Sequence, residues 1–231
     1  MHRFVAVSFS FLFVVLSACQ SESGPATLET DVQKGSYAAG LQTGMPLAAA
    51  ATHLDFDAFV AGIRDGMNGE EPALDQAELQ RALMALSTTI QEEDTQRRAA
   101  EAETNTAEAE AYLAENAGKD GVTVTESGLH YEVLREGDGP QPTPTDRIRI
   151  HYRGTLLDGT EFDSSYGGDP ASFGVSGVIP GFSEGLQLMS VGSQYRFVIP
   201  GELGYGMGGS GPLIGPMAAL VFEVELLEIV Q

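Results

Sequence analysis

The sequence predicts an α+β protein, with helices in the first half of the chain and an antiparallel sheet in the second. Residues 31–90 place apolar side chains at helical spacing, and residues 91–117 are rich in helix formers but lack an apolar face. After Val122, apolar and polar residues alternate as in half-buried strands, while Ile179–Met189 keeps helical spacing. This order favours an all-α region and a long polar helix, followed by a sheet with one helix packed on a face.

Composition limits the classes of function. The chain has 231 residues, enough for one ordinary domain and a smaller one. Its 12 basic and 33 acidic residues give a formal net charge of −21, and the acidic excess runs through both halves. A surface with this much negative charge repels the phosphate backbone of nucleic acids. We therefore expect no nucleic-acid binding. With four His and one Cys, we also expect no metal site.

The first 18 residues are interpreted as an export signal. Two polar residues after Met1 precede the apolar run Phe4–Leu16, which is too short for a permanent membrane span. The run leads into Leu16-Ser17-Ala18-Cys19, a pattern typical of bacterial lipoprotein signals, in which the cysteine is acylated and becomes the new N-terminus. We therefore expect residues 1–18 to be a signal peptide and Cys19 to be lipidated. An ordinary secretory peptide with an incidental cysteine, giving a soluble periplasmic protein, is the alternative.

Export fits the rest of the chain as well. Cys19 is the only cysteine, as expected for a protein in an oxidising compartment. Gln20 follows it instead of the Asp that resembles an inner-membrane retention signal, so we expect the outer membrane, on the periplasmic side or at the cell surface. Residues 19–30 are small and polar, which indicates a flexible tether.

Residues 31–90 carry signals for three helices. Pro46 is expected to end or kink the first helix, and Asn68-Gly69 to end the second. Asp55 is expected to cap the second, and Asp75 with Glu78 to form a capping box for the third. The apolar positions are Tyr37, Leu41, Phe56, Phe59, Val60, Ile63, Met67, Leu79, Leu83, Leu86 and Ile90.

The apolar faces of these helices need a partner, because three short helices bury little surface by themselves. A second copy of residues 31–90 is the simplest partner, and we expect a homodimer. A small monomeric bundle is the alternative. Residues 91–123 are interpreted as a solvated spacer helix and linker. A helix unbroken from Asp75 to Ala114 would be about 60 Å long, and Gly118 and Gly121 would end it.

No nucleophile–base pair stands out in the sequence. His151 lies in a predicted strand with no Ser or Cys placed for it, and a packing role fits it better than catalysis. Glu161 and Asp163 suggest a carboxylate pair for glycoside hydrolysis, although carboxylates two apart on a strand more often form a solvated face. Residues 204–209 match G-x-G-x-x-G, but prolines follow where a nucleotide site needs a helix, so we interpret them as a loop.

Aromatic and aliphatic residues recur near Gly and Pro in the second half. Such residues are most often core, and composition alone favours that interpretation over a binding pocket. They are Tyr152, Phe162, Phe173, Val178, Ile179, Phe182, Tyr205 and Phe222.

Six segments resemble, in order and spacing, the signature of FKBP-type peptidyl-prolyl isomerases over essentially all of residues 124–231. They are His151–Gly154, Asp158–Ser165, Val178–Phe182, Met189–Gly192, Leu203–Gly206 and Leu220–Leu226. The helical region and the spacer are similar, more loosely, to the dimeric macrophage infectivity potentiator type and related periplasmic isomerases. The resemblance covers nearly the whole mature chain.

The resemblance implies a half-open antiparallel sheet wrapped around one short helix, with an apolar pocket between them. It implies catalytic roles for Asp163, Tyr152, Tyr205 and Phe222, and substrate-binding roles for Phe162, Phe173, Val178, Ile179, Phe182 and Ile214. Phe182 stands where the family usually has Trp as the pocket floor, which bears on pocket depth and macrolide affinity. Strict strand alternation puts Phe162 and Asp163 on opposite faces, so the strand must end or bulge if both line the pocket.

The implied activity is cis/trans isomerisation of X-Pro bonds in unfolded or partly folded exported proteins, with no cofactor, metal or covalent intermediate. Macrolide inhibitors of the family are expected ligands. We expect the isomerase domain to keep short-peptide activity without residues 20–120. A holdase-like chaperone with secondary isomerase activity is the alternative function; a purely structural envelope lipoprotein is a third, which the pocket motifs disfavour.

Overall fold

The computed structural model describes residues 27–230, and the chain divides into two compact units, residues 1–72 and 73–231. The signal peptide, Cys19 and the tether up to residue 26 lie outside the described residues. Among residues 27–230, none of the helices combines the length and the hydropathy that a membrane span requires. The two units are described one at a time.

The first unit is helical, as expected. It contains α1 (Asp31–Gly44), the 3₁₀ helix η1 (Met45–His53) and α2 (Phe56–Asn68). Pro46 ends the α-helical geometry as predicted, since the chain continues from Met45 with the tighter turn. The predicted cap at Asp55 is confirmed, because its carboxylate accepts the Ala58 N–H at 2.9 Å. Gly69 closes α2 in the left-handed conformation, with φ 68°.

Apolar side chains remain uncovered along these two α-helices, and no described residue of α1 or α2 is buried. Phe56 is 73% exposed and Met67 is 83% exposed. The unit therefore presents the apolar surface that led us to expect a second copy.

The second unit begins with one long helix, α3 (Gln76–Ala117). Both bonds of the predicted capping box are present, because Asp75 accepts the Glu78 N–H and Glu78 accepts the Asp75 N–H. The helix runs unbroken for 42 residues, so the predicted continuous helix is confirmed, and it ends at Ala117, three residues beyond the expected Ala114.

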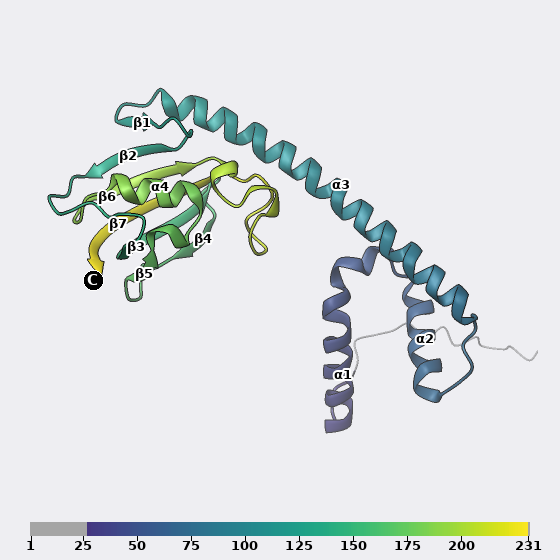
Figure 1. The fold of residues 1–231 in the computed structure, drawn as a ribbon. Helices are drawn as coiled ribbons and strands as arrows, with labels where there is room; N and C mark the ends of the chain where they lie inside the picture. The colour runs from purple at the N-terminus through teal and green to yellow at the C-terminus, as the bar shows by residue number, and fades with distance from the viewer. Residues whose placement is uncertain (1–26, 231) are drawn as a thin grey trace, which may run out of the picture. The chain divides into compact units, whose positions relative to one another are not determined.

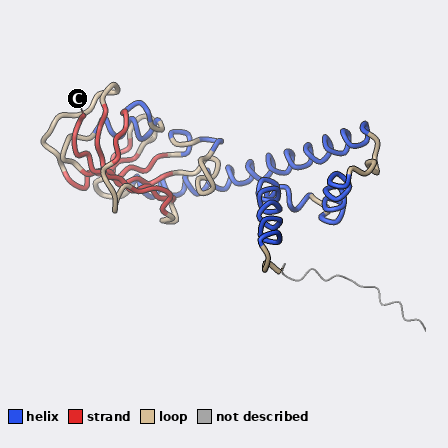
Figure 2. Tube along the Cα trace, turned by 90° about the horizontal axis from the view of Figure 1, so that it is seen from below, coloured by secondary structure: helices blue, strands red, loops and turns tan. Residues whose placement is uncertain are grey.

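A seven-stranded antiparallel sheet follows α3 (Figure 1). The strands are β1 (Val122–Val124), β2 (His130–Arg135), β3 (Arg147–Leu156), β4 (Glu161–Ser164), β5 (Ala171–Gly174), β6 (Gln194–Ile199) and β7 (Leu220–Val230). Their order is β1-β2-β6-β7-β3-β4, and β5 also pairs with β3. Figure 2 shows these strands curving together at one end of α3.

The short helix α4 (Pro180–Leu188) lies directly against β6. Two glycines make this close approach possible: a Cβ on Gly185 would stand 2.8 Å from the Phe197 ring, and one on Gly181 would stand 2.5 Å from Ile199. Phe197 and Leu186 are fully buried in the resulting core. The predicted fold class, a half-open antiparallel sheet wrapped around one short helix, is confirmed.

The interpretation of residues 91–117 as a solvated spacer is wrong for the part of α3 from Ala102 onward. Ala102, Ala109 and Asn116 are 7%, 6% and 3% exposed, and their spacing of seven puts them on one helix face. Asn116 donates to the ring nitrogen Nδ1 of His130 on β2 at 3.2 Å. Small side chains let the helix backbone approach the domain closely. Because the buried side chains on this helix face are small, a search of the sequence for large apolar residues does not find it.

Candidate active site

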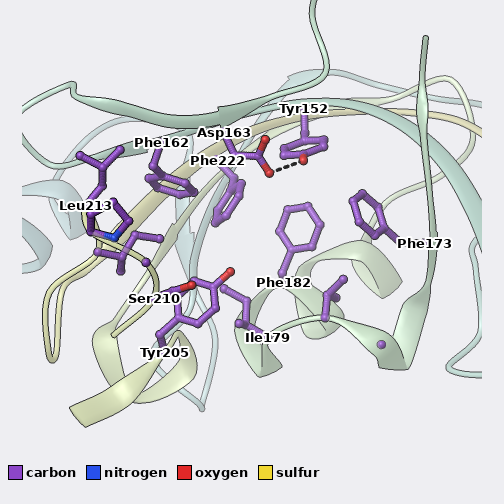
Figure 3. A pocket seen from close by; sticks show the side chains of 15 residues that line it. Tyr152, Phe162, Asp163, Phe173, Ile179, Phe182, Tyr205, Ser210, Leu213 and Phe222 are labelled. Carbon is purple, nitrogen blue, oxygen red and sulfur yellow. Dashed lines mark hydrogen bonds between the residues drawn. The ribbon is translucent and has the colours of Figure 1, made fainter. Parts of the chain in front are cut away.

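A cavity of about 650 Å³ opens between the sheet, α4 and the loop before β7 (Figure 3). All ten residues for which the resemblance implied a role line this one cavity: Tyr152, Phe162, Asp163, Phe173, Val178, Ile179, Phe182, Tyr205, Ile214 and Phe222. Sequence reasoning did not single out Gly177, Gly211, Pro212 or Leu213, which also line it. The Gly- and Pro-rich character of residues 204–216 was the available signal for three of these four.

Aromatic rings form the floor and one wall of the cavity. Phe182 on α4 and Phe222 on β7 lie 4.7 Å apart between ring centroids, and Phe222 meets Phe162 edge-on at 5.5 Å. Tyr152 on β3 meets Phe173 on β5 edge-on at 5.7 Å. These tilted and edge-to-face contacts are the favoured geometry of aromatic pairs, and they leave ring faces and edges for a small apolar ring.

Gly154 on β3 makes room for two of these rings. A Cβ at this position would stand 2.6 Å from the Phe162 ring and 2.9 Å from the Phe222 ring. The pairing of β3 with β4 shifts register between Gly154 and Thr155, which marks the expected irregularity. It lets both Phe162 and Asp163 line the cavity, as strict alternation would not.

Tyr152 and Asp163 form the polar pair of the pocket. The Tyr152 hydroxyl donates to Asp163 Oδ2 at 2.5 Å (Figure 3). Oδ1 of the same carboxylate accepts the Ser164 N–H at 2.9 Å. Burial, and then the hydrogen bond to Asp163, raise the pKa of Tyr152 well above its usual range. Tyr152 therefore remains a protonated donor, and its ring is held in place at its polar end.

The opposite wall comes from a loop. Tyr205 is 39% exposed at the rim, and Figure 3 shows its ring beside Ile179. Ser210 and Ile214 exchange two backbone hydrogen bonds of 2.8 and 3.2 Å, which fold the loop back on itself. Ile214 is buried and anchors the loop in the core. Ile179 occupies the N-cap position of α4, directly before the first helical residue.

The other chemical candidates lie outside the cavity. His151 Nδ1 is 3.0 Å from Ser165 Oγ, so, against the expectation from the sequence, a serine does lie beside this histidine. The His151 ring stacks on Tyr166 at 5.2 Å and neither His151 nor Ser165 lines the cavity, which supports the packing interpretation. Glu161 lines a separate cavity on another side of the sheet, so it does not pair with Asp163. Residues 206–208 form a short 3₁₀ turn instead of the start of a helix, as the loop interpretation predicted.

Comparison with known proteins places the chain in a family. Residues 139–227 match the family described as FKBP-type peptidyl-prolyl cis-trans isomerase, and residues 32–133 match the domain that lies amino-terminal to it. A 22 kDa FKBP-type peptidyl-prolyl cis-trans isomerase of Escherichia coli K12 is 47% identical over 205 residues, covering 88% of this chain and 98% of that protein. This chain belongs to the FKBP-type peptidyl-prolyl cis-trans isomerase family.

Other members of the family extend the likeness to both halves of the chain. The outer membrane protein MIP of Legionella longbeachae is 33% identical and covers 96% of each chain. The crystal structure of FkpA from Escherichia coli superposes with a TM-score of 0.65 at 35% identity, covering 88% of this chain and 98% of that one. The family predicted from the sequence is therefore confirmed.

Proposed function

We propose that this FKBP-type isomerase binds the proline of an exported, incompletely folded polypeptide in the aromatic cavity and accelerates rotation about the preceding peptide bond. The observation that carries the proposal is the cavity itself: six aromatic rings around a space for a small ring, with a single tyrosine–carboxylate pair among them. No cofactor is required by this chemistry.

The physics of the amide explains how such a cavity acts. Rotation about the peptide bond costs about 18–20 kcal/mol because resonance is lost. The twisted amide has less charge separation than the planar one, so an apolar environment favours it relative to water. Phe162, Phe182 and Phe222 provide that environment while they grip the proline ring.

The polar groups orient the substrate. We assign the Tyr205 hydroxyl and the Ile179 N–H to the substrate carbonyls, because both residues stand at the cavity mouth. Asp163 holds Tyr152 in place and sets the electrostatic potential beside the twisting bond. None of these groups transfers a proton or forms a covalent bond in the proposed mechanism.

A protease-coupled assay of an X-Pro peptide with the mature protein tests the activity. The assay must show acceleration over the uncatalysed exchange, which takes tens to hundreds of seconds. A macrolide inhibitor of FKBP-type isomerases should compete with the peptide for the cavity. A folded protein that leaves the exchange at its uncatalysed rate would refute the proposal.

The proposed location is the outer membrane, through a lipid on Cys19. The support is the apolar run ending at Ala18-Cys19 and the likeness to a protein named as an outer membrane protein. One acyl chain binds a membrane only marginally, so more than one is expected on the mature protein. Cys19→Ser should release the protein into the soluble periplasmic fraction; wild-type protein without acyl mass would contradict the anchor.

A homodimer through residues 31–90 is the proposed assembly. The exposed Phe56, Ile63 and Leu83 support it. Two catalytic domains would then offer a folding chain two sites of contact, and chaperone activity would follow from that second contact. If chaperone activity prevails over isomerisation, the mature protein will suppress aggregation of a client without prolines as well as of a proline-rich one.

A further inference from the structure

The loop that closes the cavity, residues 204–217 (the pocket loop), is poorly suited to hold its own shape. It contains six glycines, and Gly206, Gly209 and Gly211 have φ between 56° and 62°. Glycine has more conformational freedom to lose than any other residue, so ordering this loop is costly. Met217 at its end also has a positive φ of 58°, which is strained for a residue with a side chain.

Arg98 of α3 holds the first part of the pocket loop. Its Nη2 donates to the carbonyl oxygens of Met207 and Gly208 at 2.6 and 2.9 Å. These two carbonyls belong to the short 3₁₀ turn Gly206–Gly208. A guanidinium makes charge-assisted hydrogen bonds, which are roughly twice as strong as neutral ones.

Asn105 of α3 holds the last part. Its amide donates to the Pro216 carbonyl at 2.8 Å, directly before the strained Met217. Between the two contacts, the Glu101 carboxylate fills the space beside Gly215, where a Cβ would stand 2.1 Å from Glu101 Oε1. Arg98, Glu101 and Asn105 are spaced i, i+3, i+7, so a single helix face makes all three contacts.

We propose that Arg98 and Asn105 are positioning residues of the isomerase site, holding both ends of the pocket loop so that its middle forms the wall against the substrate. The held middle contains Ser210, Gly211, Pro212, Leu213 and Ile214, all of which line the cavity. This inference rests on the proposed function and extends the site from the sheet to α3.

The consequence is a specific effect on substrate binding. Without these bonds, the loop must be ordered by the substrate at the moment of binding, and the free energy of that ordering is lost from affinity. KM should therefore rise while kcat changes little, because the aromatic floor and the Tyr152–Asp163 pair do not depend on α3.

The test compares Arg98→Ala with Arg97→Ala in the full mature protein. Arg97 is the adjacent arginine on the same helix, but its ion pairs are with Asp94 and Glu101 on the helix itself. Arg98→Ala should raise KM for an X-Pro peptide by roughly five- to tenfold, with kcat within about twofold. Arg97→Ala should leave both near wild type. Arg98→Lys keeps the cation but replaces the rigid guanidinium by an ammonium on a flexible stem, so it should give an intermediate KM.

Hydrogen exchange of the free protein gives the second measurement. In Arg98→Ala and Asn105→Ala, amides of residues 204–217 should exchange faster, while those of β6 and β7 keep their protection. The proposal fails if Arg98→Ala matches Arg97→Ala in exchange, if the loop loosens without a change in KM, or if the whole sheet loosens with it. A wild type without peptide activity would refute the proposed function instead, and the exchange would still decide whether α3 orders the loop.

Discussion

At the scale of single residues, the site depends on where side chains are absent as much as on where they are present. Gly154 leaves the space that the Phe162 and Phe222 rings occupy, and the carboxylate of Asp163 reaches the Tyr152 hydroxyl from the same irregular stretch of β4. The irregular pairing of β3 with β4 therefore positions both the packed Phe162 and Phe222 rings and the Tyr152–Asp163 hydrogen bond.

Asp163→Ala should lower kcat/KM roughly tenfold, about 1.4 kcal/mol of barrier, because the Tyr152 hydroxyl loses its acceptor. The substitution removes little apolar area, so the fold should persist. Glu161→Ala is the matched control, since it removes a carboxylate from the same strand outside the cavity. Wild-type kcat/KM in a folded Asp163→Ala protein would contradict the assigned role.

Gly154→Ala should reduce activity more than any loss of stability explains. The new methyl group meets the rings of Phe162 and Phe222, which must shift out of the floor geometry, at a cost of about 1–3 kcal/mol of unfolding free energy. Gly174→Ala serves as the control, since that strand glycine has open space around its Cβ position. Peptide turnover and urea unfolding measure the two effects separately; unchanged turnover would mean that the rings adapt.

At the scale of elements, the sequence predicted the strands, α4 and the capped start of α3 because each carries a local signal. Asp75 and Glu78 mark a helix start, and the alternation in residues 148–152 marks a strand. No local signal in the sequence predicted that α3 packs against the domain, because Ala102 and Asn105 do not form a recognisable apolar helix face. The ten pocket residues came from the family resemblance; periodicity alone would have left them as core.

The docked part of α3 changes the expectation for truncated proteins. Deleting residues 31–72 leaves α3 and its contacts with the pocket loop, so short-peptide kcat/KM should stay within about twofold of wild type. Deleting residues 20–120 removes Arg98 and Asn105, and we now expect KM to rise instead of staying unchanged. Equal activity of the two truncated proteins, each shown to be folded by circular dichroism, would contradict this.

Acid should weaken the attachment of the α3 end to β2. Burial lowers the pKa of His130, whose Nδ1 accepts from Asn116, so the native state favours the neutral ring. Below about pH 6.5 the unfolded chain binds a proton that the folded chain resists, and the free energy of unfolding therefore falls as pH drops. His130→Gln should reduce the difference in unfolding free energy between about pH 7.5 and 5.5. If the unfolding free energy of His130→Gln changed as much between these two pH values as that of the wild type, His130 would not be the group responsible.

At the scale of the whole molecule, assembly is the property that the exposed apolar side chains of the helical unit predict. Ile63→Asp should convert a dimer into a monomer, because a carboxylate at a buried interface has no partner. Short-peptide activity should remain, and assistance to a proline-limited folding protein should fall. Arg64→Asp is the control on the same helix. Sedimentation decides: a wild type that is already monomeric at micromolar concentration would refute the dimer.

The phenylalanine at the floor of the cavity has an optical consequence. The chain contains no tryptophan, so its ultraviolet emission comes from tyrosines, two of which, Tyr152 and Tyr205, border the cavity. Phe182→Trp would create a single indole at the cavity floor, in contact with Phe222. Its emission wavelength would report the polarity of that cavity alone. Occupancy by a peptide or a macrolide could then be titrated directly, in the intact protein and without a label.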